Sequence, residues 1–259
     1  MSIDVVDLRN FYAQRLGVVA RRFVGRGIRG RWHDVRAKCV LGIGYATPYL
    51  GLFREEAERC LAFMPGTQGV VKWPTARPAL TALVDECEMP LPDGAVDLVL
   101  LVHTLEMAQH PQQLLREVWR VLSPGGKLLA VVPNRRGLWA RMDTTPFGHG
   151  RPYSRSQIIH LLRETWFTPM GWDEALYVPP IPRGWFLRSA VAWERVGATI
   201  SAPFAGVHIV EATKQVYRAL PAREKQRIVP VPALEPALAP SPGAASVSNQ
   251  SLVGRDPPW

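Results

Sequence analysis

Cysteine is scarce in this chain: Cys39, Cys60 and Cys87 are the only three among 259 residues. Their wide spacing suits neither a disulfide framework nor a metal centre, so we expect no metal ion. Each cysteine lies in or beside an apolar run, which favours buried thiols in a reducing compartment. The composition therefore predicts a cytoplasmic location.

Long hydrophobic runs are also missing. No apolar stretch approaches the roughly 20 residues that a membrane-spanning helix needs. The first residues include Asp4 and Asp7 and lack the apolar segment of a secretory signal peptide. We therefore expect neither a membrane span nor a signal peptide.

Acidic residues are outnumbered, since 31 Lys and Arg face 22 Asp and Glu and give a net charge of +9. The excess is concentrated in residues 1–38. Such a segment can attract phosphates, nucleic acid or an anionic membrane surface, and an ordinary solvated helix face explains it equally well. We expect at most a weak association with an anionic membrane. The basic residues of the segment are Arg9, Arg15, Arg21, Arg22, Arg26, Arg29, Arg31, Arg36 and Lys38.

The hydrophobic pattern divides the chain into three parts. Residues 1–34 form a basic helical extension, with a helix over 3–24 that the glycines at 25, 27 and 30 should end. Residues 35–228 alternate between predicted strands and helices, which is typical of an α/β sheet. Residues 229–259 contain seven prolines and no apolar periodicity, so we expect a disordered tail.

The elements of the central part are predicted as follows. Buried aliphatic runs indicate strands, and the clearest helix has Leu114, Leu115 and Val118 on one face. Strands are expected at 39–41, 60–64, 80–84, 97–102, 127–132, 176–178 and 206–212, and helices at 48–59, 111–122, 154–165 and 185–197.

Four motifs follow one another in this region. A strand enters a glycine-rich turn over 40–47, and the acidic stretch DECEMPLPDG follows the third strand at 85–94. The fourth strand and its exit read DLVLLVHTLE at 97–106. The segment LREVWRVLSPGGKLLAVVPN occupies 115–134. Glycine lets the backbone approach a ligand, and the following helix N-terminus offers free N–H groups to an anion.

The order and spacing of these motifs resemble class I S-adenosylmethionine-dependent methyltransferases, in particular the small-molecule branch known as type 11. The stretches NRRGLWAR and FGHGRPYSR are further similar to those of uncharacterised alphaproteobacterial members. The resemblance implies a Rossmann-like, seven-stranded, mostly parallel sheet. It also implies S-adenosylmethionine as cofactor and transfer of its methyl group to a small molecule.

The resemblance places the cofactor at the glycine turn, the second strand end and the acidic loop. Each position also has a plain structural explanation, such as a tight turn at Gly44 or a loop-capping turn at Asp85. The expected cofactor-binding residues are Gly42, Gly44, Tyr45, Ala46, Met64, Asp85, Glu86, Cys87 and His103.

The candidate catalytic residues are His103, at a strand end where open α/β sheets bind ligands, and His149 in a glycine-rich loop. Arginine recognises carboxylate and phosphate groups, although an exposed surface explains these arginines nearly as well. The candidate substrate-binding residues are Glu106, Arg135, Arg136, Arg151 and Tyr153.

Some family features are absent. No Asp or Glu occurs between Arg59 and Thr81, where a carboxylate usually binds the cofactor ribose, and Gln68 is the nearest polar substitute after Met64. Pro48 stands where the family has its third glycine. A second hypothesis is therefore a degenerate methyltransferase fold that serves as a non-catalytic binding or assembly protein. Nucleic-acid methylation is disfavoured, because neither an Asn-Pro-Pro-aromatic motif nor a Pro-Cys pair is present.

Overall fold

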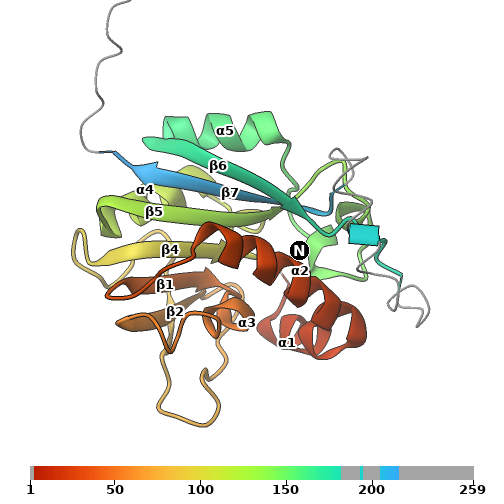
Figure 1. The fold of residues 1–259 in the computed structure, drawn as a ribbon, viewed down its shortest axis with the longest axis horizontal. Helices are drawn as coiled ribbons and strands as arrows, with labels where there is room; N and C mark the ends of the chain where they lie inside the picture. Colours follow the sequence, from red (N-terminus) through yellow and green to blue (C-terminus); the bar gives the residue numbers. More distant parts are fainter. Residues whose placement is uncertain (1–2, 182–192, 195–204, 216–259) are drawn as a thin grey trace, which may run out of the picture. The chain divides into compact units, whose positions relative to one another are not determined.

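Seven strands form one sheet in the order β3-β2-β1-β4-β5-β7-β6. The computed structural model describes residues 3–181, 193–194 and 205–215, and its sheet is seen in Figure 1. The strands are β1 (Cys39–Gly44), β2 (Arg59–Pro65), β3 (Thr81–Val84), β4 (Val96–Val102), β5 (Leu122–Pro133), β6 (Phe167–Ala175) and β7 (Val207–Lys214).

The sheet is mostly parallel. Strand β1 pairs in parallel with β2 and β4, so that Leu41 lies between Leu61 and Val99. Only β7 runs against its neighbours β5 and β6. The aliphatic run of β4 is buried, as expected for a parallel strand covered on both faces. The seven-stranded, mostly parallel fold predicted from the sequence is confirmed.

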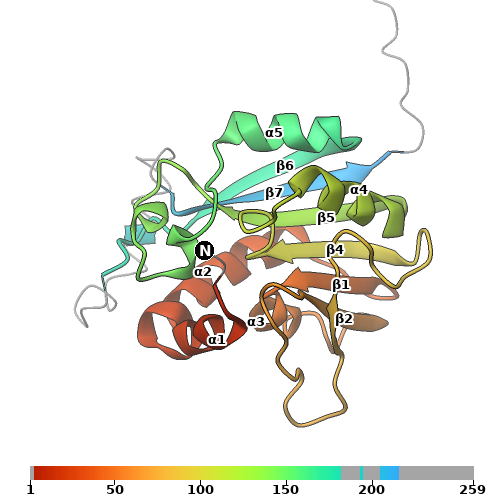
Figure 2. The same ribbon diagram turned by 180° about the vertical axis from the view of Figure 1, so that it is seen from behind.

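Helices cover both faces of the sheet (Figures 1 and 2). One hydrophobic core contains side chains of α1, α2 and α3, and the other contains those of α4 and α5. Helix α5 begins with a capping box between Ser154 and Gln157, which satisfies its first free N–H groups. The helices are α1 (Val5–Ala13), α2 (Arg15–Arg31), α3 (Thr47–Leu50), α4 (Pro111–Val121) and α5 (Arg155–Glu164), with short 3-10 helices at Trp139–Arg141 and Pro146–Gly148.

The N-terminal helix differs from the prediction. Its break lies at Gln14, whose backbone is extended, rather than at the glycines. Gly25 and Gly27 lie inside α2, where a Cβ on Gly25 would touch Leu52 and Tyr49 and one on Gly27 would overlap Ile209. Glycine here lets α2 pack closely on its neighbours, which outweighs its low helix propensity.

Other boundaries also needed correction. The helix predicted over 48–59 is only the single turn α3, and the strand predicted at 176–178 is instead β6. Strand β6 contains Pro169 and Gly171, which a sheet edge tolerates but which hide the strand signal in the sequence. The helix predicted over 185–197, apart from residues 193 and 194, and the predicted tail 229–259 lie outside the described residues. The three-part division of the chain stays a prediction.

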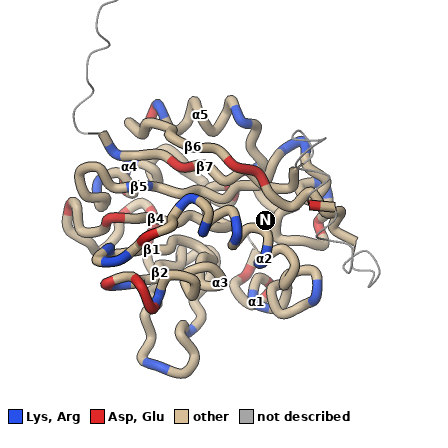
Figure 3. Tube along the Cα trace, viewed as in Figure 1, with Lys and Arg blue, Asp and Glu red and all other residues tan. Residues whose placement is uncertain are grey.

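Several basic residues lie along α1 and α2, where Figure 3 colours Lys and Arg blue. Some form ion pairs within the fold: Arg29 with Glu56, Arg31 with Asp173 and Arg36 with Asp34. Others stay exposed on α1 and α2, and weak association with an anionic membrane stays a prediction. Across the described ranges, no helix combines the length and apolar character needed to cross a membrane. The exposed arginines are Arg9, Arg15, Arg21, Arg22 and Arg26.

A buried histidine lies in the antiparallel part of the sheet. His208 on β7 packs against the Trp172 ring, with centroids 4.7 Å apart. Glu174 Oε1 lies 3.3 Å from His208 Nδ1 without forming a hydrogen bond. Burial and the nearby Arg155 guanidinium lower the pKa of His208 from 6.5 to about 4. The folded protein therefore holds this imidazole neutral.

This histidine predicts a loss of stability in mild acid. The unfolded chain binds a proton at His208 below pH 6.5, whereas the folded chain does so only near pH 4. The free energy of unfolding should fall by about 2 kcal/mol between pH 7.5 and pH 5.0 through this group. Urea denaturation at both pH values should show the loss in the wild type and not in His208→Gln. His160→Gln, at an exposed histidine, should keep the wild-type pH dependence.

Candidate functional site

A cleft of about 1000 Å³ opens at the carboxyl ends of β2, β3 and β4. Ligands of open α/β sheets bind at this edge, and the volume is ample for a nucleoside-sized molecule. Its walls come from the loops that follow these strands and from the loop that precedes α5. The lining residues are Gly66, Thr67, Leu83, Val84, Asp85, Glu86, Cys87, Glu106, Met107, Ala108, Gln109, His110, Gln113, Gly150 and Arg151.

The acidic loop after β3 is folded by its own side chain. Asp85 Oδ1 accepts a hydrogen bond of 2.8 Å from the Cys87 backbone N–H. This is the loop-capping turn that the sequence offered as the plain explanation. Asp85, Glu86 and Cys87 nevertheless all line the cleft. Their role as cofactor contacts stays a prediction.

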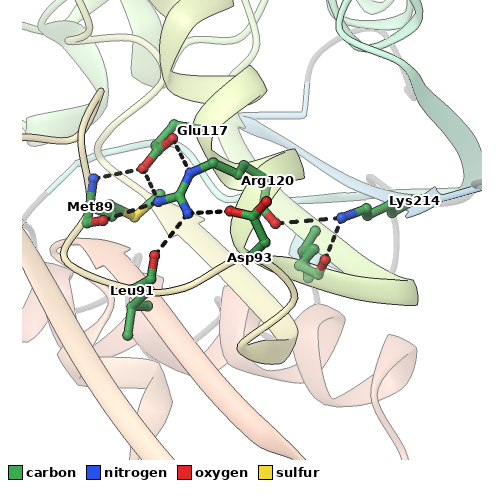
Figure 4. A network of polar contacts seen from close by, with 7 residues as sticks. Met89, Leu91, Asp93, Glu117, Arg120 and Lys214 are labelled. Carbon is green, nitrogen blue, oxygen red and sulfur yellow. Dashed lines mark hydrogen bonds and ion pairs between the residues drawn. The ribbon is translucent and has the colours of Figure 1, made fainter.

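A second network fixes the far end of the same loop (Figure 4). The Arg120 guanidinium on α4 donates to both oxygens of Glu117, to Asp93, and to the Leu91 and Met89 carbonyl oxygens. Glu117 in turn accepts from the Met89 backbone N–H. Hydrogen bonds from Arg120 hold the pKa of Glu117 below its ordinary value. The loop is therefore anchored to α4 by charge-assisted bonds.

Behind the cleft, four side chains form a buried hydrogen-bonded chain. Glu106 Oε1 lies 3.3 Å from His103 Nδ1. His103 Nε2 lies 2.9 Å from the Tyr12 hydroxyl, which is 3.0 Å from the Tyr49 hydroxyl. Burial, and next the neighbouring Tyr49, raise the pKa of Tyr12 well above its ordinary value. Tyr12 therefore keeps its proton at neutral pH.

Two buried oxygen atoms next to this chain have no hydrogen-bond partner. They are Glu106 Oε2 and Gln68 Oε1. Gln68 donates through its amide nitrogen to the His103 carbonyl oxygen at 2.9 Å. An unpaired buried oxygen costs free energy, so both atoms indicate a missing donor, which a bound water or a ligand can supply.

The glycine turn after β1 is filled by the protein itself. A Cβ on Gly44 would overlap the Thr104 hydroxyl and the Val102 carbonyl oxygen, and one on Gly42 would lie 2.6 Å from Ala46 Cβ. The Tyr12 ring stacks on Tyr45 with centroids 5.6 Å apart. The glycines thus have a packing role, and their contact with a cofactor stays a prediction, as does that of Tyr45 and Ala46.

The other candidates are dispersed. Met64 is fully buried in the core and accepts a hydrogen bond from the Val71 backbone at its sulfur, so it does not line the cleft. His103 does not line the main cleft and contacts Glu106 instead. His149 lines a separate cleft of about 480 Å³ against α1, and its Nε2 is 2.9 Å from the Asp143 carbonyl oxygen.

Of the predicted substrate-binding residues, Glu106 and Arg151 line the main cleft. Tyr153 lines the neighbouring groove and donates to the Leu105 carbonyl oxygen at 3.2 Å. Burial raises the pKa of Tyr153 to about 12. Arg135 and Arg136 are exposed, away from the main cleft.

Sequence reasoning missed several residues of the site. Tyr12 carried only the signal of an apolar helix stripe, and its hydrogen bond to His103 spans 91 positions. Thr67 and Met107 follow β2 and β4, so their positions after predicted strand ends could have identified them.

Part of the chain is similar to known methyltransferases. Residues 42–130 match the methyltransferase domain family. A probable S-adenosylmethionine-dependent methyltransferase of Mycolicibacterium smegmatis is 37% identical over 82 residues, or 31% of this chain and 32% of the relative. Ajmaline N-methyltransferase of Rauvolfia serpentina is 28% identical over 98 residues, or 37% and 32%. The chain thus spans about a third of the length of these relatives.

Among solved structures, a methyltransferase from Archaeoglobus fulgidus superposes with a TM-score of 0.57 at 17% identity, covering 79% of this chain and 96% of that one. The class I methyltransferase fold predicted from the sequence is thereby confirmed. This family implies S-adenosylmethionine as cofactor. The resemblance to alphaproteobacterial members is not tested. Among the residues that the structure describes, no three His, Cys, Asp or Glu side chains converge to hold a metal ion.

Proposed function

We propose that this chain, a class I methyltransferase by its fold and by the domain that residues 42–130 match, transfers a methyl group from S-adenosylmethionine to a small molecule. The observation that supports the proposal best is the cleft at the carboxyl ends of β2, β3 and β4, lined by the acidic loop that the motif analysis selected. This is the place where an α/β sheet of this topology binds its ligand.

The cleft fits the nucleoside part of the cofactor. Asp85–Cys87 and Gly66–Thr67 line it, and it offers both apolar walls and carboxylates. The unpaired oxygen of Gln68 suits a ligand that carries hydroxyl donors, as this cofactor does. Gln68 is also the polar side chain expected from the sequence to substitute for the missing ribose-binding carboxylate. These residues would hold the cofactor, which supplies a methyl group on a positively charged sulfur.

The packing around the glycine turn after β1 limits how a cofactor can reach it. The Tyr12 ring stacks on Tyr45, and its hydroxyl bonds to His103. The backbone carbonyl oxygen of Gln68 accepts a hydrogen bond of 2.8 Å from the Val5 backbone N–H. A cavity of only about 10 Å³ lies between Gln68 and His103. Because Tyr12 stacks on the residue after Gly44, we expect the amino-acid part of a cofactor to reach Gly44 only after Tyr12 moves away.

The acceptor is proposed to be a small molecule that enters the same cleft. Ajmaline N-methyltransferase, one of the relatives, carries such a substrate in its name. The neighbouring groove, lined by Tyr153, shares Arg151 and Gln113 with the cleft and extends it by about 470 Å³. The chain's own residues would bind and orient the acceptor, which supplies much of the rate in a direct transfer.

The non-catalytic hypothesis is less well supported. It depends on the missing acid after β2 and on Pro48, whereas the cleft and the unpaired Glu106 and Gln68 oxygens are features of a ligand site. A protein that serves only in assembly has no need of a ligand cleft of this size, whereas a non-catalytic binding protein would keep one.

Ligand binding is the direct test. S-adenosylhomocysteine should bind with micromolar affinity in isothermal titration. At about a hundredfold excess over Kd it should stabilise the fold by about 2.7 kcal/mol and raise Tm by roughly 5–10 °C. No heat and no thermal shift up to several millimolar ligand would contradict the proposal.

Two substitutions at Asp85 sharpen this test. Asp85→Ala removes both the acceptor for the Cys87 N–H and the carboxylate, whereas Asp85→Asn keeps an oxygen that can accept from Cys87. If the carboxylate contacts the cofactor, both variants should bind about ten- to a hundredfold more weakly. If only the loop turn matters, Asp85→Asn should bind like the wild type.

We also propose that the protein acts in the cytoplasm. The three cysteines are free thiols in the structure, and Cys60 is buried. Burial raises the pKa of the Cys60 thiol to about 11, which keeps it protonated and unreactive. Unpaired thiols of this kind suit a reducing compartment.

A further inference from the structure

Glu106 is a buried ionisable residue of the site. Its side chain is 1% exposed, yet the residue lines the open cleft. One carboxyl oxygen faces His103, and the other, Oε2, has no hydrogen-bond partner in the described structure. A buried carboxylate with one unpaired oxygen at a cleft wall is a site for a hydrogen-bond donor.

The hydrogen bonds of the buried side chains next to Glu106 all point toward its carboxylate. A carboxylate only accepts, so His103 carries its proton on Nδ1 when it donates to Glu106. The neutral imidazole then accepts at Nε2 from the Tyr12 hydroxyl, and Tyr12 accepts from Tyr49. These proton positions are assigned from the partners. Each donor in the chain polarises the next, and the chain ends on the Glu106 carboxylate.

The cleft favours a positively charged ligand. Three acidic residues line it, Asp85, Glu86 and the buried Glu106, against the single arginine Arg151. Leu83 and Met107 add apolar surface beside them. An organic cation with an apolar body fits this combination better than an anion does, because it pairs with the acids and covers the apolar wall.

We propose that Glu106 binds the amino group of an amine acceptor and removes its proton. The inference rests on the proposed function, whose acceptor it narrows to an amine. The ammonium group donates a hydrogen bond to Glu106 Oε2. The N–H bond then breaks, an O–H bond forms on Glu106, and the electron pair stays on nitrogen. The products are a neutral amine with a free lone pair and a protonated Glu106. His103 and Tyr12 are positioning residues, which hold the carboxylate in place.

The first test compares two ligands on the wild-type protein. 2-Phenylethylamine is protonated at neutral pH, and 2-phenylethanol has the same skeleton without the charge. Isothermal titration in the presence of saturating S-adenosylhomocysteine should show the amine binding at least tenfold more tightly. Equal affinities, or an amine that does not bind, would overturn the inference. This comparison does not depend on whether any variant folds.

The second test uses Glu106→Gln with Glu55→Gln as its matched control. Glu55 is exposed on the loop after α3, outside the cleft. Glu106→Gln keeps the size of the side chain and removes its charge, so 2-phenylethylamine should bind about ten- to a hundredfold more weakly. Glu55→Gln should bind the amine like the wild type. An unchanged amine affinity in Glu106→Gln would overturn the inference.

Binding of S-adenosylhomocysteine alone separates the two proposals. A wild type that binds S-adenosylhomocysteine and ignores 2-phenylethylamine keeps the proposed methyltransferase function and overturns the role of Glu106. A wild type that binds the amine through Glu106 and ignores S-adenosylhomocysteine supports the amine site and overturns the proposed function.

Discussion

Gly44→Ala is expected to lower the free energy of unfolding by about 2–5 kcal/mol. Gly44 has φ +79°, a left-handed conformation that costs an L-residue roughly 1–2 kcal/mol. A new Cβ would also overlap the Thr104 hydroxyl and the Val102 carbonyl oxygen on the neighbouring strand end. Forcing them apart adds roughly 1–3 kcal/mol of overpacking. Denaturation by urea, monitored by circular dichroism, measures the loss.

Gly30→Ala is the matched control for this substitution. Gly30 lies in helix α2, and a Cβ there would meet no atom within 4 Å. The change should stabilise the protein by about 0.5–1 kcal/mol, because alanine favours the helix. The two substitutions therefore have opposite expected signs. A Gly44→Ala variant as stable as the wild type would show that the turn and β4 can separate without cost.

Arg120→Met is expected to destabilise the protein by about 2 kcal/mol and to weaken S-adenosylhomocysteine binding about tenfold. The substitution leaves Glu117, Asp93 and two loop carbonyl oxygens without their shared donor. Charge-assisted bonds are worth roughly 1.5–3 kcal/mol, and partial exposure of Arg120 reduces their value. Because the bonds hold the loop that lines the cleft, binding should fall with stability. Thermal melting and titration calorimetry measure the two effects.

Arg116→Met tests whether any arginine of α4 has this effect. Arg116 is exposed and lies over the Trp166 ring at 5.6 Å, a contact worth about 0.5–1 kcal/mol. Its loss should leave ligand affinity unchanged. Arg120→Lys should behave like Arg120→Met, because an ammonium cannot reproduce the forked geometry that joins Glu117 to Asp93. Normal binding by Arg120→Lys would contradict the role given to that geometry.

The parts of the fold predicted best from the sequence are those that local patterns encode. The aliphatic run of β4 and the apolar face of α4 each identify one element. Burial on both faces gives a continuous apolar run, and burial of one helix stripe gives a helical period. The glycines of α2 misled the prediction. They serve contacts with Tyr49 and Ile209, which no local pattern reveals.

The residues of the site differ in the same way, because local sequence patterns identify some of them and tertiary packing places the others. Asp85 and Glu106 could be chosen from the sequence because each follows a predicted strand, and both line the cleft. Tyr12 could not, because its place beside His103 depends on how α1 packs across the sheet edge. Met64, selected for its position at the end of β2, is buried in the core instead. A position just after a strand end predicts that a residue lies near the cleft. Whether its side chain enters the cleft depends on the packing around it.

The break at Gln14 bears on the rate at which a cofactor can enter. Helix α1 is joined to α2 through this one extended residue, and Tyr12 near its end stacks on Tyr45, the residue after Gly44. We expect that only molecules in which α1 has moved aside accept a cofactor there, so the apparent Kd should rise as their fraction falls. Association then proceeds no faster than α1 departs, however high the ligand concentration. A binding rate that levels off with increasing S-adenosylhomocysteine would measure the opening rate of the helix directly.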